Sequence, residues 1–378
     1  MSFAFTYGPR VLFGAGRASE LGAQLPAGRC LFVTDGQVRA LGLADPALAS
    51  LAAAGIEAIL FDAVEQDPSL ATLNAALVAG EGCTSVVGVG GGSPMDVAKL
   101  AAYLLGTGEE IETLWGVGKA TGRRLPLAQV PTTAGTGSEA TAVSVITVGG
   151  SEKKAVNSPP LLADLAILDP ELTLTMPAGV TAATGIDAMV HAIEAYTSAR
   201  LKNPMSDLLA REALVLLAGN LLDAIARPDD RAARGAMLLG AHLAGVAFAN
   251  APVAGVHALA YPLGGHFHVP HGAANALMLT HVLRHNLHAA MPLYAELGPL
   301  LDPSLEGQGQ QGQAQGFIEA MARLSVASGV PQRLSEVGIG AEHLDLLAAE
   351  AMKQERLLVN NPCPITQGDA RRLYEAAL

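Results

Sequence analysis

The chain has 378 residues, of which 35 are acidic and 23 basic, so its net charge is −12 at neutral pH. This charge excludes a protein that binds nucleic acid or an anionic membrane through a basic surface. Half of the residues are hydrophobic and 15% are charged, which excludes a disordered chain. The length predicts about two domains.

The three cysteines, Cys30, Cys83 and Cys363, lie far apart and form no C-x-x-C pair. Their spacing predicts neither a disulfide framework nor a zinc site made of thiolates. The first 14 residues contain no basic segment followed by a long apolar stretch, so we expect no secretory signal peptide. A cytoplasmic protein is the resulting expectation.

Short β-branched runs alternate with Ala/Leu-rich stretches through the first half of the chain. We expect strands at residues 11–13, 30–34, 58–61, 85–89, 127–131 and 142–148, helices at 69–79 and 96–105, and a further extended piece at 165–168. Strands that alternate with helices are typical of βαβ units. The first half therefore predicts an α/β domain with a parallel sheet.

The pattern changes after Pro177, because Ala and Leu recur at helical spacing from Thr181 onward and few β-branched runs remain. We place a domain boundary near residue 178, with an α/β domain over residues 1–178 and an all-helical domain over residues 179–378. A Gly/Gln-rich patch at residues 307–316 has the composition of an exposed flexible loop.

Two glycine-rich segments each follow an expected strand, at residues 88–96 (GVGGGSPMD) and 131–139 (PTTAGTGSE). Consecutive glycines let the backbone approach a phosphate, and a following helix N-terminus supplies N–H donors. The first segment lacks G-x-G-x-x-G spacing, so a tight strand–helix turn is a close alternative for it alone. The second lacks the Gly-Lys-Ser/Thr ending of a nucleotide-triphosphate loop. Together, the two segments predict a dinucleotide site.

Asp35 comes at the end of an expected strand. A carboxylate in this place accepts hydrogen bonds from a ribose diol and repels a 2′-phosphate. An N-cap or turn aspartate before Gly36 is an equally good interpretation from spacing alone.

Asp187 and His191 are four residues apart in an expected helix, so their side chains share one helix face. Alone, the pair favours a simple hydrogen bond. His257 and His271 flank a Gly-Gly break farther on. One aspartate and three histidines make a compact site for Fe²⁺, Zn²⁺, Ni²⁺ or Co²⁺. The spacing leaves open which three histidines contribute.

A run of 49 residues from Gly235 to Leu283 contains no Asp, Glu, Lys or Arg and holds six of the ten histidines. A transmembrane helix needs about 20 continuous apolar residues, whereas polar residues, prolines and glycines interrupt this run. We interpret it as a buried helical region around a polar site, and we expect no membrane partner.

Four motifs resemble the iron-dependent (group III) alcohol dehydrogenases, in that family's order and spacing. They are Gly90-Gly91-Gly92-Ser93-Pro94-x-Asp96, the segment 131–139, Gly185-x-Asp187-x-x-x-His191 and Pro270-His271-Gly272. The resemblance continues to Asn360-Asn361-Pro362 and so covers effectively the whole chain. It implies an NAD-binding α/β domain followed by an all-helical metal-binding domain.

The resemblance also implies roles for single residues. The implied ligands of Fe²⁺ or Zn²⁺ are Asp187, His191, His257 and His271. The implied NAD-binding residues are Gly91, Gly92 and Ser93 at the pyrophosphate, Asp96 of the same motif, Thr132, Thr133, Thr136 and Lys154, and Asp35, which selects NAD over NADP. Phe248 matches an aromatic residue that lines the family's substrate pocket.

Two positions depart from the family pattern. Many members have a histidine where this chain has Tyr261, and that histidine lies near the nicotinamide as a candidate proton relay. We expect Tyr261 to relay the proton here, with His266 or His268 as alternatives. Asp67 stands where many members have asparagine, which puts polar contacts near the ribose and substrate in doubt.

These observations predict a metal-assisted hydride transfer between a small alcohol or hydroxyacid and a nicotinamide. A hydroxyacid–oxoacid transhydrogenase is the alternative, because Tyr261 is similar to that branch of the family. A maleylacetate reductase, a lyase similar to dehydroquinate synthase and a non-catalytic NAD-binding protein fit less well. The family's dimers imply a homodimer that pairs through residues 3–11.

Overall fold

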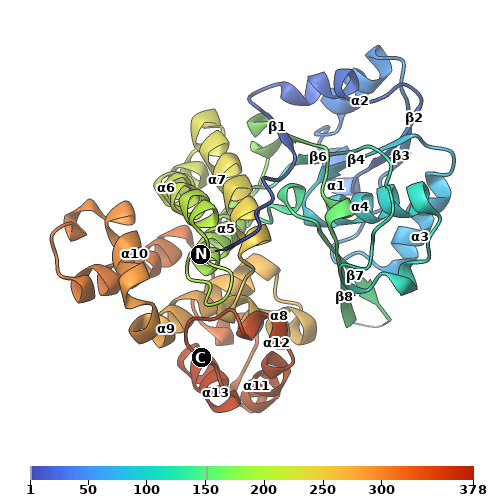
Figure 1. Cartoon of the computed structure of the whole chain (residues 1–378). Helices are drawn as coiled ribbons and strands as arrows, with labels where there is room; N and C mark the ends of the chain where they lie inside the picture. The colour runs from blue at the N-terminus through green and yellow to red at the C-terminus, as the bar shows by residue number, and fades with distance from the viewer. Residues whose placement is uncertain (1, 150–151) are drawn as a thin grey trace. The chain divides into compact units, whose positions relative to one another are not determined.

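The structure, a computed structural model, describes residues 2–149 and 152–378. The chain forms two compact units (Figure 1). One unit comprises residues 7–175, and the other comprises residues 176–378 together with residues 2–6.

The first unit is built on a six-stranded, fully parallel sheet in the order β1-β9-β6-β4-β2-β3. Its strands are β1 (Arg10–Phe13), β2 (Arg29–Val33), β3 (Glu57–Phe61), β4 (Ser85–Gly90), β6 (Leu127–Pro131) and β9 (Leu165–Leu168). Its helices are α1 (Gly36–Ala40), α2 (Asp45–Ala53), α3 (Leu70–Ala79) and α4 (Gly92–Thr107), with 3₁₀ turns η1 (Arg17–Gln24), η2 (Ile111–Thr113), η3 (Ser138–Ala140), η4 (Pro159–Leu161) and η5 (Pro170–Thr173).

Both faces of this sheet are covered, and this explains the continuous apolar runs of its inner strands. Along β2, Leu31 and Val33 lie in a core shared with α3 and α4, whereas Cys30 and Phe32 lie in the core shared with η1 and α2. Successive side chains of a strand point to opposite faces, so a strand buried on both sides is hydrophobic at every position. The predicted α/β domain with a parallel sheet is confirmed.

One expected strand belongs to a different sheet. Residues 142–148 do not join the parallel sheet, because β7 (Val143–Val148) pairs antiparallel with β8 (Glu152–Asn157). With β5 (Gly116–Val117) these strands form a separate three-stranded sheet. Strand β8 begins with three charged residues, of which Glu152 and Lys153 are exposed, so its sequence lacks the apolar pattern by which a strand is predicted.

The second unit is helical, as predicted. Its helices are α5 (Ala178–Tyr196), α6 (Pro204–Ala226), α7 (Arg231–Asn250), α8 (Gly255–Phe267), α9 (His271–Leu301), α10 (Gln310–Ser328), α11 (Leu344–Met352), α12 (Glu355–Leu358) and α13 (Gln367–Ala376), with 3₁₀ turns η6 (Pro303–Leu305), η7 (Leu334–Val337) and η8 (Ala341–His343). In the described part of the chain, every strand lies between residues 10 and 168.

The Gly/Gln-rich patch at residues 307–316 is not the flexible loop that its composition predicted. Helix α10 begins at Gln310 and takes in most of the patch. Glutamine is a good helix former, and composition alone hides this when it is mixed with glycine. Gly316 is buried against Leu305, where an added Cβ would lie 2.4 Å from a methyl group, so packing requires a glycine there.

The charge-free run covers most of α7, all of α8 and the start of α9. Helix α7 alone among the described helices is long and apolar enough to cross a membrane, but 67% of its apolar window is buried inside the protein. The core helix of a globular protein meets the same criterion. The run therefore forms the interior of the helical unit.

Candidate metal centre

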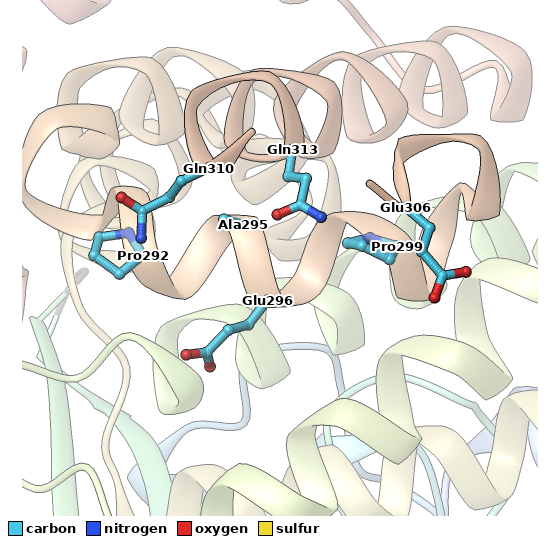
Figure 2. Close-up of a pocket in the computed structure, with 7 residues that line it drawn as sticks. All are labelled: Pro292, Ala295, Glu296, Pro299, Glu306, Gln310 and Gln313. Atoms are coloured by element: carbon cyan, nitrogen blue, oxygen red, sulfur yellow. The ribbon is translucent and has the colours of Figure 1, made fainter. Parts of the chain in front are cut away.

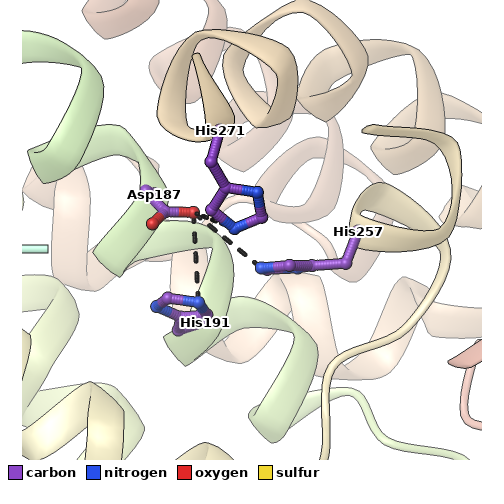
Figure 3. Close-up of side chains that lie close together, drawn as sticks. All are labelled: Asp187, His191, His257 and His271. Atoms are coloured by element: carbon purple, nitrogen blue, oxygen red, sulfur yellow. Dashed lines mark ion pairs between the residues drawn. The ribbon is translucent and has the colours of Figure 1, made fainter. Parts of the chain in front are cut away.

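Three helices of the second unit bring four side chains together (Figure 3). Asp187 and His191 lie one turn apart on α5, His257 lies in the first turn of α8, and His271 is the first residue of α9. The four candidate ligand atoms lie within 4.8 Å of one another. These are the four residues that the family resemblance implied, and spacing alone had left the three histidines open.

The geometry centres on one carboxylate oxygen. Asp187 Oδ1 lies 3.9 Å from His191 Nε2, 3.8 Å from His257 Nε2 and 3.6 Å from His271 Nε2. Three of the side chains are buried, whereas 45% of the His271 side chain is exposed. A hard carboxylate oxygen and three imidazole nitrogens are a donor set for Fe²⁺ or Zn²⁺, so these residues fit a divalent transition metal.

The environment of Asp187 favours its charged form. Burial acts to raise the pKa of this carboxyl group, but the three histidines and the Asn275 amide together hold the pKa below its ordinary value. Such a carboxylate is deprotonated at neutral pH, as a metal ligand must be.

Two buried polar residues that the sequence analysis missed contact these ligands. Glu194, on α5, accepts a hydrogen bond from His257 Nδ1 at 2.7 Å. Asn275, on α9, donates from Nδ2 to Asp187 Oδ1 at 2.6 Å, and the same nitrogen lies 3.2 Å from His257 Nε2 and from His271 Nε2. Helical spacing was the available signal, because Glu194 follows His191 by three residues and Asn275 follows His271 by four.

The two predicted catalytic residues lie beside the ligands. The ring of Phe248 stacks on His191 with centroids 4.4 Å apart. The ring of Tyr261, one turn after His257 on α8, lies 5.9 Å from that of His271. Burial raises the pKa of the Tyr261 hydroxyl, so this group stays protonated at neutral pH.

His266 and His268, the alternative relay residues, lie elsewhere in the helical unit. His266 Nε2 is 3.7 Å from Glu350 Oε2 on α11. His268 ends α8 in a left-handed conformation and is exposed. Neither belongs to the ligand group that the described residues form.

In the first unit, the two glycine-rich segments meet at the carboxyl ends of neighbouring strands. Gly90 of β4 stands opposite Pro131 of β6, and Thr132 N donates to Gly90 O at 2.9 Å. A Cβ added to Gly91 would lie 3.7 Å from the Thr133 side chain, and a Cβ added to Gly92 would lie 3.2 Å from the Thr136 side chain. The predicted phosphate-binding residues, including Ser93 in the first turn of α4, therefore form one loop cluster.

Asp35 takes one of the two roles that its sequence left open, the cap of a helix. Its Oδ1 accepts a hydrogen bond from Val38 N at 2.8 Å and so caps α1. Its Oδ2 lies beside Gly90, since a Cβ added there would be 3.3 Å away. The N-cap is a feature of the structure, and the ribose contact remains a prediction.

The Asp96 carboxylate accepts hydrogen bonds from three protein groups near the loop cluster. Its Oδ1 accepts from Ser138 Oγ at 2.7 Å and from Lys99 Nζ at 3.3 Å, and its Oδ2 accepts from Val145 N at 2.9 Å. Asp96 thus ties α4 to the second glycine-rich segment, which suits a residue that positions the loops.

Two further predicted positions lie near the three-stranded sheet. Lys154, on β8, has its Nζ 3.8 Å from Glu152 Oε2, and its cofactor contact remains a prediction. Asp67 has a φ of 55°, a left-handed conformation that asparagine adopts more readily, and it accepts from Lys153 Nζ at 2.6 Å. The aspartate at position 67, where many family members have asparagine, thus forms an ion pair with Lys153.

A separate cavity of about 380 Å³ lies between α9 and α10 of the helical unit (Figure 2). Its lining combines two carboxylates, two amides, two prolines and an alanine: Glu296, Glu306, Gln310, Gln313, Pro292, Pro299 and Ala295. None of the four candidate ligands borders it. The cavity is therefore distinct from the candidate metal centre.

Comparison with known families agrees with this arrangement. The family model described as iron-containing alcohol dehydrogenase matches residues 8–170, and the model for the C-terminal part of the Fe-containing alcohol dehydrogenase family matches residues 181–378. The chain belongs to the iron-containing alcohol dehydrogenase family.

Curated relatives of this alcohol dehydrogenase match over almost their whole length. The long-chain-alcohol dehydrogenase 1 of Geobacillus thermodenitrificans is 40% identical over 94% of this chain and 90% of its own. The NAD-dependent methanol dehydrogenase of Bacillus methanolicus is 33% identical over 98% of both chains. A solved 1,3-propanediol oxidoreductase is 35% identical, with a TM-score of 0.96 over 100% of both chains. These dehydrogenase relatives do not favour the transhydrogenase, maleylacetate reductase or lyase alternatives.

Proposed function

We propose that this alcohol dehydrogenase uses NAD and a divalent metal, Fe²⁺ or Zn²⁺, to interconvert a small alcohol or hydroxyacid and its carbonyl product. The observation that carries this proposal is the group of Asp187, His191, His257 and His271, whose donor atoms lie within 4.8 Å of one another. Relatives named as methanol and 1,3-propanediol dehydrogenases support a small alcohol as substrate, whereas one relative is named for long-chain alcohols.

In this proposal, the chemistry supplied on binding would be Lewis acidity toward the substrate oxygen from the metal and hydride acceptance or return from NAD. The four ligand side chains hold the metal in a largely buried environment, where electrostatic interactions are stronger than in water. The aromatic ring of Phe248 fixes the plane of His191 by stacking on it. The exposed side of His271 leaves access for a small substrate.

Tyr261 carries the substrate's hydroxyl proton to solvent in this proposal. A protonated tyrosine hydroxyl donates one hydrogen bond and accepts another, so it relays a proton without a net change of charge. Burial raises its pKa, which keeps the hydroxyl in the protonated form that a relay uses.

The loop cluster of the first unit binds the dinucleotide in this proposal. Backbone N–H groups at the start of α4, after Gly91, hold the pyrophosphate at the positive end of the helix dipole. The Thr132, Thr133 and Thr136 hydroxyls add donors around the same phosphates. The Asp35 carboxylate accepts from the ribose diol and repels the 2′-phosphate of NADP. We further propose a cytoplasmic homodimer.

Metal analysis combined with an NAD⁺-coupled screen tests this function. The purified chain is expected to contain iron or zinc and to reduce NAD⁺ with at least one short alcohol, diol or hydroxyacid. A chain that binds neither metal and reduces no NAD⁺ with any of these substrates contradicts the proposal. Light scattering on the same preparation measures the oligomeric state.

A further inference from the structure

Glu194 is a buried carboxylate on α5, with 3% of its surface exposed. It follows Asp187 by seven residues and His191 by three, so it shares their helix face. Burying a charge is costly unless hydrogen bonds satisfy it. Its partners therefore indicate its role.

All three donors to Glu194 come from the start of α8. Its Oε1 accepts from Val256 N at 2.6 Å, and its Oε2 accepts from Ala254 N and from His257 Nδ1, both at 2.7 Å. Helix α8 begins at Gly255, and its own N-cap residue, Ala254, has no side-chain oxygen to offer. Glu194 thus supplies from α5 the cap that the sequence of α8 lacks.

The same contact determines which ring nitrogen of His257 carries the hydrogen. A carboxylate only accepts hydrogen bonds, so the Nδ1 atom that it contacts must be the donor. A neutral His257 then has its lone pair on Nε2, the atom that lies 3.8 Å from Asp187 Oδ1 within the ligand group. This tautomer is the one that a metal ligand bound through Nε2 requires.

We propose that Glu194 is the positioning residue of the metal centre, which caps α8 and holds His257 with its Nε2 directed at the metal. One carboxylate thereby joins the start of α8 to the helix that carries two other ligands. This proposal rests on the proposed function for the identity of the metal centre, but its test does not depend on catalysis.

The test compares Zn²⁺ affinity in the native chain and in a Glu194→Gln variant, by competition with a chromophoric chelator. Glutamine has a similar shape but only one accepting oxygen. If that oxygen takes the place of Oε2, the NH₂ group opposes Val256 N; if it takes the place of Oε1, the NH₂ group opposes Ala254 N and favours the wrong His257 tautomer. We expect Zn²⁺ to bind about 10- to 100-fold more weakly, as when other partners of ligand histidines are removed.

Asp230→Ala is the matched control for the loss of a helix cap. Asp230 caps α7 in the same unit by accepting from Ala232 N and Ala233 N, and it lies outside the ligand group. This variant is expected to unfold at a lower temperature and to bind Zn²⁺ like the native chain. A Glu194→Gln variant with native Zn²⁺ affinity overturns the proposal, since Glu194 is then only a cap.

If Glu194→Gln fails to fold, the Zn²⁺-loaded native chain provides a second measurement. Histidine-selective ¹⁵N NMR, assigned by a His257→Asn variant, is expected to show a protonated Nδ1 on His257. An unprotonated Nδ1 overturns the proposal. A native chain that binds no Zn²⁺ contradicts the proposed function itself. Equal Zn²⁺ affinities in the native chain and the Glu194→Gln variant contradict only the role of Glu194.

Discussion

A single oxygen of Asp187 faces three imidazole nitrogens, and this arrangement depends on neighbours that do not belong to the ligand group. Asn275 donates to that oxygen, Glu194 fixes the ring of His257, and Phe248 stacks on His191. Groups of this kind orient metal ligands, and their loss commonly weakens metal binding. Single substitutions can therefore separate metal binding from the later chemistry.

Tyr261→Phe removes the proposed relay and leaves the four candidate ligands in place. We expect the turnover number to fall roughly a hundredfold, because proton transfer by a positioned group contributes about 10²- to 10⁴-fold. The metal content is expected to stay native. Steady-state kinetics and metal analysis on the same preparation measure both effects.

Tyr294→Phe is the control for this substitution. Tyr294 is a fully buried tyrosine of the same unit, and it lies outside the ligand group. Its loss is expected to leave turnover unchanged. If Tyr261→Phe also turns over at the native rate, Tyr261 is not the relay.

Asp35→Ser tests the choice of coenzyme without removing the helix cap. Serine is as good an N-cap as aspartate, so α1 should keep its bond to Val38 N. Removal of the negative charge is expected to raise kcat/KM for NADP⁺ relative to NAD⁺ by about tenfold, which corresponds to about 1.4 kcal/mol. Kinetics with both coenzymes measure the ratio.

Asp45→Ser removes the same charge from an exposed position at the start of α2, where the carboxylate pairs with Arg39. This control is expected to leave the coenzyme ratio unchanged. Equal ratios in the native chain and in Asp35→Ser would show that Asp35 acts only as the cap of α1.

At the scale of elements, a glycine sets how closely two of the metal-binding helices approach. A Cβ on Gly272, next to His271 on α9, would lie 2.4 Å from the carbonyl oxygen of Ala183 on α5. Ala183 precedes Asp187 by one helical turn. The contact between α9 and α5 therefore determines the distance from His271 to Asp187.

Gly272→Ala should push the start of α9 away from α5, because the obstructing atoms belong to the backbone and cannot rotate aside. We expect the unfolding free energy to fall by about 1–3 kcal/mol, as in other overpacked sites, and Zn²⁺ to bind more weakly. Thermal unfolding and chelator competition measure the two effects.

Gly265→Ala is the matched control on α8, since a Cβ there meets no atom within 4 Å. It is expected to keep native Zn²⁺ affinity and to gain up to about 1 kcal/mol of stability from helix propensity. Native Zn²⁺ affinity in Gly272→Ala would show that α9 can shift without moving His271.

The elements that the sequence predicted correctly are those with a strong local pattern. Strand β4 is apolar at most positions because helices cover both of its faces, and β6 and β9 begin and end at the predicted residues. Strand β8 escaped prediction because its first three residues are charged and only Val156 is buried. Helix α4 starts at Gly92, before the predicted residue 96, because Gly-Ser-Pro is a poor helix interior but an acceptable first turn.

The same limit applies to the candidate site. The family resemblance implied all four members of the ligand group, whereas spacing alone left the three histidines open. Glu194 and Asn275 have only helical spacing from a ligand histidine as a signal, and many helical residues share that spacing. Their contacts join residues 63 and 88 positions apart along the chain. Such pairs follow from the packing of α5, α8 and α9, which the sequence of any one helix does not determine.

At the scale of the whole molecule, the candidate ligands and the dinucleotide loops belong to different units of the chain. The four ligands come from α5, α8 and α9 of the helical unit, whereas the glycine-rich segments follow β4 and β6 of the sheet unit. The uncharged run supplies two of the ligands and much of the helical interior. Metal and dinucleotide should therefore stabilise different parts of the molecule.

Removal of the metal with a chelator tests this division. A ligand that binds only the folded state adds about 4 kcal/mol of stability at a thousandfold excess over its Kd. Chelation should therefore increase amide hydrogen exchange in α5, α8 and the start of α9, while β4 and β6 keep their protection. Adding NAD⁺ to the metal-free chain should instead protect the turn between β4 and α4. Equal loss of protection in both units after chelation would contradict a metal centre confined to the helical unit.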